Sequence, residues 1–135
     1  MYFKTKDAEV FRMTTCVIAS ATVIAPGDLV TLSSGLIIKA VAASTAVAYC
    51  PKGSAVGETT CEVSLGNEFT LVGTADANFA VTDKGLECDL VLSGAIQLID
   101  IGASATDVLK VGISDSAGTV GATTVVEVRI NKPLY

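Results

Sequence analysis

The sequence contains no histidine, so it lacks the commonest general base and the commonest metal-binding side chain. Ser-His-Asp and Cys-His catalysis are therefore excluded in their usual forms. Its four cysteines, at positions 16, 50, 61 and 88, form no Cys-x-x-Cys pair, which argues against zinc sites. We expect free, buried thiols. If the cysteines were oxidised, their spacing would not choose among the possible pairings.

Loops that cradle phosphates or calcium are also absent, since there is no Gly-x-x-x-x-Gly-Lys, no Gly-x-Gly-x-x-Gly and no Asp-x-Asp-x-Asp-Gly run. Asp28, Asp76, Asp83 and Asp115 lie in or beside turns, where aspartate is favoured because it caps local backbone N–H groups. We therefore expect no metal, no cofactor and no enzymatic activity. An enzyme that uses carboxylates alone is the least favoured class.

Positive charge and long apolar runs are scarce. Nine Lys and Arg against 14 Asp and Glu give a net charge of -5, and the local basic bias of Lys4, Lys6 and Arg12 is diluted by Asp7 and Glu9. This argues against nucleic acid as a partner. No stretch approaches the ~18 apolar residues of a transmembrane helix, and charges occupy the place of a signal-peptide core, so neither a membrane nor an export signal is expected.

The 135 residues are 50% hydrophobic and only 17% charged, with 5% aromatics. Such a chain predicts one domain whose core is built from Ala, Val, Leu and Ile. Because so little charge is present, apolar surface remains to be covered, commonly by identical subunits.

Two similar stretches predict β-hairpins. Residues 28–39 read Asp-Leu-Val-Thr-Leu-Ser-Ser-Gly-Leu-Ile-Ile-Lys, and residues 89–100 read Asp-Leu-Val-Leu-Ser-Gly-Ala-Ile-Gln-Leu-Ile-Asp. Each has an apolar strand, a Ser/Gly reversal and an apolar return. Their recurrence indicates scaffold rather than a functional motif, and it favours a barrel or sandwich made of paired hairpins.

Turn signals recur roughly every ten residues, as in all-β domains. Strands are expected at 61–65, 69–72 and 79–81, and a closing strand at 125–131 should bury Val126, Val128 and Ile130 on one face. Residues 41–48 favour a strand over a short helix. Residues 105–110 are the best remaining candidate for one helical turn, capped by Thr106, although residues 108–111 also read as a strand. The predicted fold is all-β, a small β-barrel, β-tulip-like or sandwich domain over 15–135.

Residues 1–14 differ in composition and are interpreted as an extended N-terminal arm. Its aromatic residues Tyr2, Phe3 and Phe11 could anchor in a groove of a partner. The alternative is an arm folded back on its own domain.

The segments 25–30, 79–85, 87–91 and 125–131 together resemble those of head decoration, or capsid cement, proteins of tailed bacteriophages. The resemblance covers most of residues 15–131 and concerns turn placement and an Ala, Gly, Thr and Val-rich composition. It implies a small β-barrel or β-tulip domain on the outer shell of the head, often a trimer at threefold positions, that bridges neighbouring major capsid proteins.

If the resemblance holds, the chain is a structural virion protein of the outer capsid surface, assembled in the host cytoplasm, with the major capsid protein and its own homotrimer as partners. The expected capsid contacts are in the arm: Tyr2, Phe3, Lys4, Lys6, Phe11 and Arg12. The alternative is a β-barrel module of a tail or surface protein that binds a small molecule or glycan, against which the low aromatic content argues.

Overall fold

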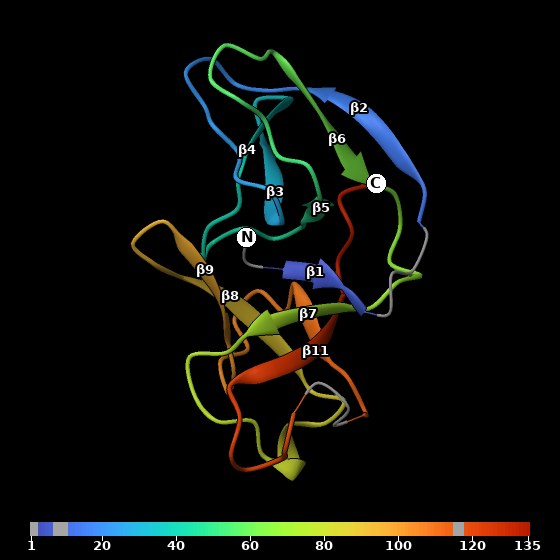
Figure 1. The fold of residues 1–135 in the computed structure, drawn as a ribbon, viewed down its shortest axis with the longest axis vertical. Helices are drawn as coiled ribbons and strands as arrows, with labels where there is room; N and C mark the ends of the chain where they lie inside the picture. Colours follow the sequence, from blue (N-terminus) through green and yellow to red (C-terminus); the bar gives the residue numbers. More distant parts are fainter. Residues whose placement is uncertain (1–2, 7–10, 115–117) are drawn as a thin grey trace.

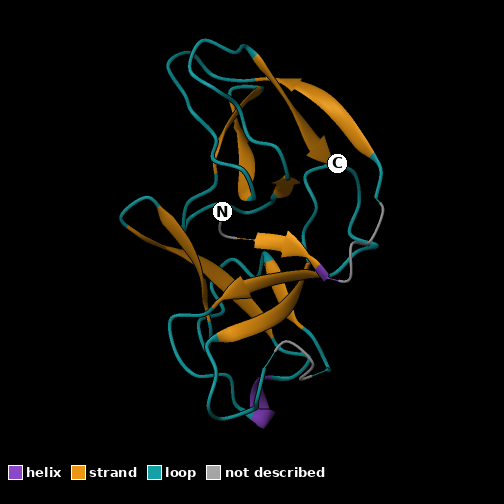
Figure 2. Cartoon of the chain, in the orientation of Figure 1, coloured by secondary structure: helices purple, strands orange, loops and turns teal. Residues whose placement is uncertain are grey.

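A computed structural model of the chain describes residues 3–6, 11–114 and 118–135. These residues form antiparallel β-sheets and the short 3-10 helix η2 (Val81–Asp83), as Figures 1 and 2 show. The strands are β1 (Phe3–Thr5), β2 (Met13–Val17), β3 (Asp28–Ser33), β4 (Leu36–Lys39), β5 (Ala48–Cys50), β6 (Thr60–Ser64), β7 (Leu71–Thr74), β8 (Glu87–Ser93), β9 (Ile96–Asp100), β10 (Leu109–Val111) and β11 (Val125–Ile130). The all-β prediction is confirmed, and within the described ranges the strands pack as in a sandwich without closing into a barrel.

The strands fall into two lobes, one above the other in Figure 1. The sheet lobe holds a six-stranded sheet in the order β1-β7-β11-β10-β8-β9. The ribbon lobe holds the three-stranded sheet β4-β3-β5 and the two-stranded ribbon β2-β6. Two apolar clusters correspond to this division, a larger one centred on the sheet lobe, to which Leu29 and Tyr49 of the ribbon lobe also belong, and a smaller one within the ribbon lobe.

Both predicted hairpins are confirmed, as β3–β4 and β8–β9. The first reverses through Ser34 and Gly35, both at positive φ, and the second through Gly94 alone at positive φ. These are the backbone signatures of type I′ and type II′ turns, whose twist matches that of paired strands. Asp89 lies one residue closer to its turn than Asp28 does. The two side chains therefore point to opposite faces of their hairpins.

Two expectations for single segments are corrected, and one alternative is decided. Residues 41–46 form no strand but contain turns and bends, and β5 begins only at Ala48. Residues 79–81 are no strand, since the Asp83 carboxylate accepts the Ala80 N–H at 2.8 Å and the chain enters η2 instead. The helical turn considered for 105–110 does not form, because the carboxylate of Asp89 binds the backbone of that loop. The strand alternative at 108–111 is confirmed, since Leu109–Val111 form β10.

The remaining strands follow the sequence pattern closely. The segment expected at 61–65 is β6, and that expected at 69–72 is shifted to β7. In β11 the three residues Val126, Val128 and Ile130 are buried as predicted. Glu127, expected on the outer face, is also buried, and its carboxylate lies 3.2 Å from the Lys6 ammonium. Pairing with a cation compensates for the burial of that charge.

The N-terminal segment packs on the domain. β1 forms an edge of the six-stranded sheet, and Phe3 is fully buried against Gly73. Glycine is required there, because a Cβ atom at position 73 would lie 2.5 Å from the Phe3 ring. The described part of residues 1–14 therefore has extended backbone but corresponds to the alternative in which the arm folds back on its own domain.

A buried amide joins the two hairpins and thereby the two lobes. Gln97 of β9 is 1% exposed. Its Oε1 accepts the N–H of Leu29 at 2.7 Å, and its Nε2 donates to the carbonyls of Leu29 at 2.8 Å and Ala40 at 3.0 Å. The Gln97 side chain thus gives hydrogen-bond partners to buried backbone groups of the other lobe, which water does not reach.

We predict that Gln97→Met lowers the free energy of unfolding by at least about 2 kcal/mol, because the substitution keeps the volume but leaves two buried backbone groups, the Leu29 N–H and the Ala40 carbonyl, without a partner. Urea denaturation at neutral pH measures this change. The matched control is Ile96→Ala at the neighbouring position, which is 46% exposed and should cost less than about 1 kcal/mol. Equal effects of the two substitutions would contradict the role assigned to the amide.

Candidate functional site

The structure separates the predicted contact residues into buried and exposed groups. Phe3 lies in the core, and Phe11 stacks on Phe69 with ring centroids 4.6 Å apart, so both rings are internal anchors and Phe3 offers no surface to a partner. Lys6 is held by Glu127. Lys4 and Arg12 are exposed.

Tyr2 lies outside the described residues. Arg12 is exposed and directly precedes β2, a strand that is itself partly exposed.

Strand β2 forms the outer edge of the ribbon lobe (Figure 1). Among the described residues its paired strand is β6 alone. The Leu65 N–H donates to the Arg12 carbonyl at 2.8 Å, and the Ile18 N–H donates to the Thr59 carbonyl at 2.9 Å. Hydrogen-bonded positions alternate in an antiparallel pair, so the backbone N–H and C=O groups of Met13, Thr15 and Val17 point away from β6.

The same three positions are exposed, with Met13 at 39% and Val17 at 54% exposure. Natural edge strands are usually blunted by charge, proline or a bulge. The sequence of β2, Met-Thr-Thr-Cys-Val, carries neither charge nor proline, and its register with β6 is continuous. The edge is therefore suited to receive an extended segment by strand addition.

The edge of β1 differs from this edge. The Phe3 N–H donates to the Gly27 carbonyl, and the Phe3 carbonyl accepts the Tyr49 hydroxyl at 3.1 Å. These contacts cover the outward-facing groups of Phe3 at the β1 edge. We call Met13, Thr15 and Val17 with their outward backbone groups the β2 edge.

The arm was predicted to end at residue 14, which lies within β2, so the prediction did not recognise β2 as one strand. Its β-branched residues from Thr15 onward were a usable signal for a strand. That the strand would lie at an edge could not be read from it, because the edge depends on which strands pair across the fold.

Exposed valines continue beyond the end of β2 at the tip of the ribbon lobe. Val23 is 53% exposed and Val56 is 87% exposed. They line an open hollow of about 430 Å³ between the loops at 18–23 and 56–59. This end of the molecule therefore presents small apolar side chains next to the β2 edge.

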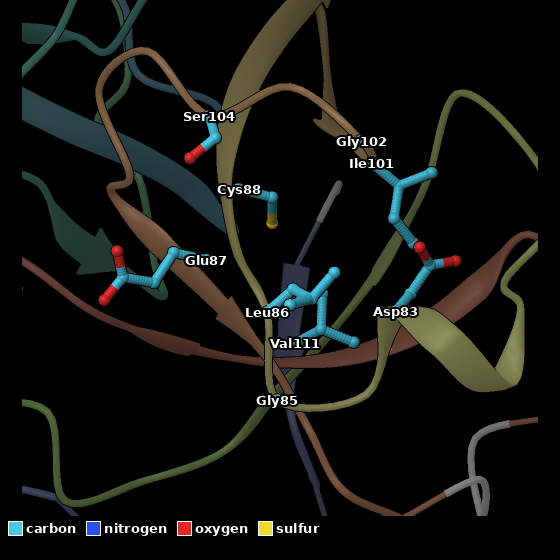
Figure 3. Close-up of a pocket in the computed structure, with 9 residues that line it drawn as sticks. All are labelled: Asp83, Gly85, Leu86, Glu87, Cys88, Ile101, Gly102, Ser104 and Val111. Atoms are coloured by element: carbon cyan, nitrogen blue, oxygen red, sulfur yellow. The ribbon is translucent and has the colours of Figure 1, made fainter.

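A second open hollow of about 430 Å³ lies in the sheet lobe, around Cys88 (Figure 3). In this view the Cys88 thiol lies between Ser104 and Glu87 on one side and Ile101 and Asp83 on the other. Its remaining lining residues are Gly85, Leu86, Gly102 and Val111. The hollow thus combines apolar side chains with two carboxylates and one thiol.

The chemistry of this hollow is that of a structural site. Burial and, after it, the neighbouring carboxylates, with Asp89 first, raise the pKa of the Cys88 thiol to about 12, so it is protonated at neutral pH and a poor nucleophile. The Asp83 carboxylate accepts the Ala80 N–H, and the Ser104 hydroxyl donates to Asp107 at 2.5 Å. These groups hold the surrounding loops in place.

No group of three or more His, Cys, Asp or Glu side chains in residues 3–6, 11–114 and 118–135 is placed to hold a metal ion. Within the same ranges, no helix has the length and apolar character needed to span a membrane. Comparisons with protein-family models, curated proteins and solved structures give no match.

The Asp89 carboxylate holds the loop at 105–107, which borders the hollow around Cys88. Its carboxylate accepts the N–H groups of Ala105 at 2.8 Å, Thr106 at 2.9 Å and Asp107 at 2.9 Å. Burial raises the pKa of Asp89, but these backbone donors outweigh that effect and the net pKa lies below its ordinary value. A carboxylate with a lowered pKa stabilises the fold above its unfolded pKa, and that stabilisation is lost as the pH falls through its folded pKa.

We predict that Asp89→Asn lowers the free energy of unfolding by about 1–2 kcal/mol at neutral pH, since charged acceptors form the stronger hydrogen bonds. The difference from the wild type should begin to shrink below about pH 4, where Asp89 becomes protonated in the unfolded chain, and should vanish as the pH falls through the lowered pKa of the folded state. Denaturant unfolding across this pH range measures both effects. Glu87→Gln, which removes the same charge from an exposed position of β8, is the control and should cost less than about 0.5 kcal/mol. A difference that grows in acid would contradict the role of Asp89.

Proposed function

We propose that this protein is a head decoration protein of a tailed bacteriophage, which binds the outer surface of the capsid and stabilises the joints between major capsid proteins without catalysing a reaction. The observation that carries the proposal is the β2 edge, an uncharged and exposed strand edge on a domain whose β1 edge is covered at Phe3. The resemblance to capsid cement proteins gives the identity of the partner.

A cement protein acts by burying surface across a joint, which in a specific interface is about 800 Å² per partner. Strand addition supplies main-chain hydrogen bonds, and alternate side chains supply specificity. On β2 those side chains are Met13, Thr15 and Val17, with Arg12 beside them as an exposed cation. An extended segment of the major capsid protein laid along β2 would bury all four.

Linked lobes are a further requirement, because a brace between capsomers must transmit force from one contact to another. The buried Gln97 amide joins the lobes. The proposed assembly is a homotrimer on the outer surface of the virion, in which the scarcely charged composition accounts for subunit contacts.

The alternative, a module that binds a small molecule or glycan, would use the hollow around Cys88. The side chains that line it include no aromatic residue, whereas small-molecule sites are typically lined by apolar and aromatic groups around a few polar ones. The geometry of the described residues therefore favours the capsid-binding proposal.

Removal of the whole arm is a poor test, because it would delete Phe3 from the core and the first two residues of β2, Met13 and Thr14. Point changes on the β2 edge avoid this. Thr15→Pro removes an outward N–H without touching the ladder to β6, which edge strands tolerate. Val17→Lys places a charge on the edge, the device by which natural proteins block strand addition.

We predict that the wild-type protein co-sediments with undecorated expanded capsids and raises their rupture temperature, and that Thr15→Pro and Val17→Lys each weaken binding at least about tenfold, a loss of about 1.4 kcal/mol or more. Val56→Lys, which adds the same charge at a more exposed valine off the edge, is the control and should bind like the wild type. Failure of the wild-type protein to bind or stabilise capsids would contradict the proposed function. Normal binding by both edge variants would contradict the role of β2.

A further inference from the structure

Three of the four cysteines gather on one side of the ribbon lobe. Cys16 of β2 and Cys61 of β6 are direct partners in the antiparallel register. The thiol of Cys61 also hydrogen-bonds to that of Cys50 in β5. The Cys16 thiol donates to the hydroxyl of Tyr135 at 3.3 Å. The cluster therefore holds three free thiols and one phenol from four separate parts of the chain.

The backbone register of Cys16 and Cys61 brings them close to the separation of a disulfide. Because the Ile18 N–H bonds to Thr59 and positions alternate, Cys16 and Cys61 form a hydrogen-bonded pair. Cα atoms of such a pair lie about 5.5 Å apart, within the range of disulfides. Cβ atoms of opposite residues lie about 4.5–5.5 Å apart, slightly more than a disulfide spans, so the two strands must approach each other a little for the bond to form. Side chains of directly opposite residues project from the same face of the ribbon, so the two sulfurs lie on one side.

The two thiols differ in access. Cys16 is half-buried, whereas Cys61 is 5% exposed and Cys50 is 0% exposed. Burial, followed by the neighbouring Cys50 thiol, raises the pKa of Cys61 to about 12, and burial likewise raises the pKa of Cys50. An incoming reagent therefore meets Cys16 first, and Cys61 stands directly across from it to complete a second step.

We propose that Cys16 and Cys61 form a modification site, in which a low-molecular-weight disulfide such as oxidised glutathione converts the thiol pair into an intrachain disulfide between β2 and β6. The inference uses the thiol geometry alone and does not depend on the proposed function.

The reaction is a two-step thiol–disulfide exchange. The Cys16 thiolate attacks one sulfur of the small disulfide, whose S–S bond breaks, and one small thiolate leaves. Cys61 then loses its proton to water, attacks the Cys16 sulfur and expels the second small thiolate. Because the pKa of Cys61 is raised to about 12, this second attack is the slower of the two steps. The two protein thiols together lose two electrons and two protons, and the small disulfide gains both and leaves as two thiols.

Two structural consequences follow. The bond would fix β2 to β6 and close a long loop between positions 16 and 61, which limits the freedom of the unfolded chain. It would also consume the S–H group that donates to Tyr135, so the terminal residue would lose this contact. Cys50 is the competing partner, because it too contacts Cys61.

The experiment treats the folded full-length protein with oxidised glutathione at about pH 8, where thiols of ordinary pKa are partly ionised, and maps the cross-links by mass spectrometry without reduction. We expect a Cys16–Cys61 link and a rise of the thermal midpoint by more than about 5 °C, both reversed by dithiothreitol. Cys61→Ser should stop at a mixed disulfide of glutathione on Cys16.

Cys50→Ser and Cys88→Ser are the controls, and both should still form the Cys16–Cys61 link. Should Cys50→Ser fold poorly, the map of the wild-type protein decides between the partners by itself. A Cys50–Cys61 link in the wild type would overturn the proposal, as would a Cys16 that stays unmodified in the folded protein while the urea-unfolded protein reacts.

Discussion

The buried amide of Gln97 is the interaction on which the arrangement of the two lobes depends. It satisfies the buried N–H of Leu29 and the buried carbonyl of Ala40, and it adds a second donor to the Leu29 carbonyl, which also accepts the Ala40 N–H. An unpartnered buried group costs free energy comparable to a lost hydrogen bond, so the second hairpin is held against the first in one orientation. Lys39 strengthens the same junction, since its ammonium contacts the Asp28 carboxylate and the Ala95 carbonyl.

The chain termini add further links between the lobes. β1 comes from the N-terminal segment and completes the six-stranded sheet, while Tyr49 of the ribbon lobe donates to the carbonyl of Phe3. After β11 the chain crosses to the ribbon lobe, where the Leu134 N–H donates to Val47 and the Gly66 N–H donates to the Tyr135 carbonyl. These contacts use polar groups at the lobe boundary and do not involve the outward-facing groups of the β2 edge.

Strand β2 has an exposed face and an inward face, because alternate side chains of a strand point to opposite sides. Met13, Thr15 and Val17 are exposed, while Cys16, on the opposite face, packs against the core of the ribbon lobe. A capsid strand added to the edge and a disulfide on the inner face would therefore not compete for the same atoms. A bond from Cys16 to Cys61 would hold β2 in place without occupying the edge.

The sequence by itself determined the all-β class, both hairpins with their turns, the turn role of Asp28 and Asp83, the free thiols and the inward face of β11, because each depends on local turn chemistry or on a period of two. It did not reveal the burial of Phe3, the pairing of Glu127 with Lys6, the opposition of Cys16 and Cys61, or the exposed edge of β2. Only the tertiary structure decided these, since each is a contact between residues far apart in the chain, and strand order is set by the packing of the whole core. Gln97 is the clearest case: in the sequence it is one polar residue among the apolar residues of a hairpin, and in the fold it is the link between the lobes.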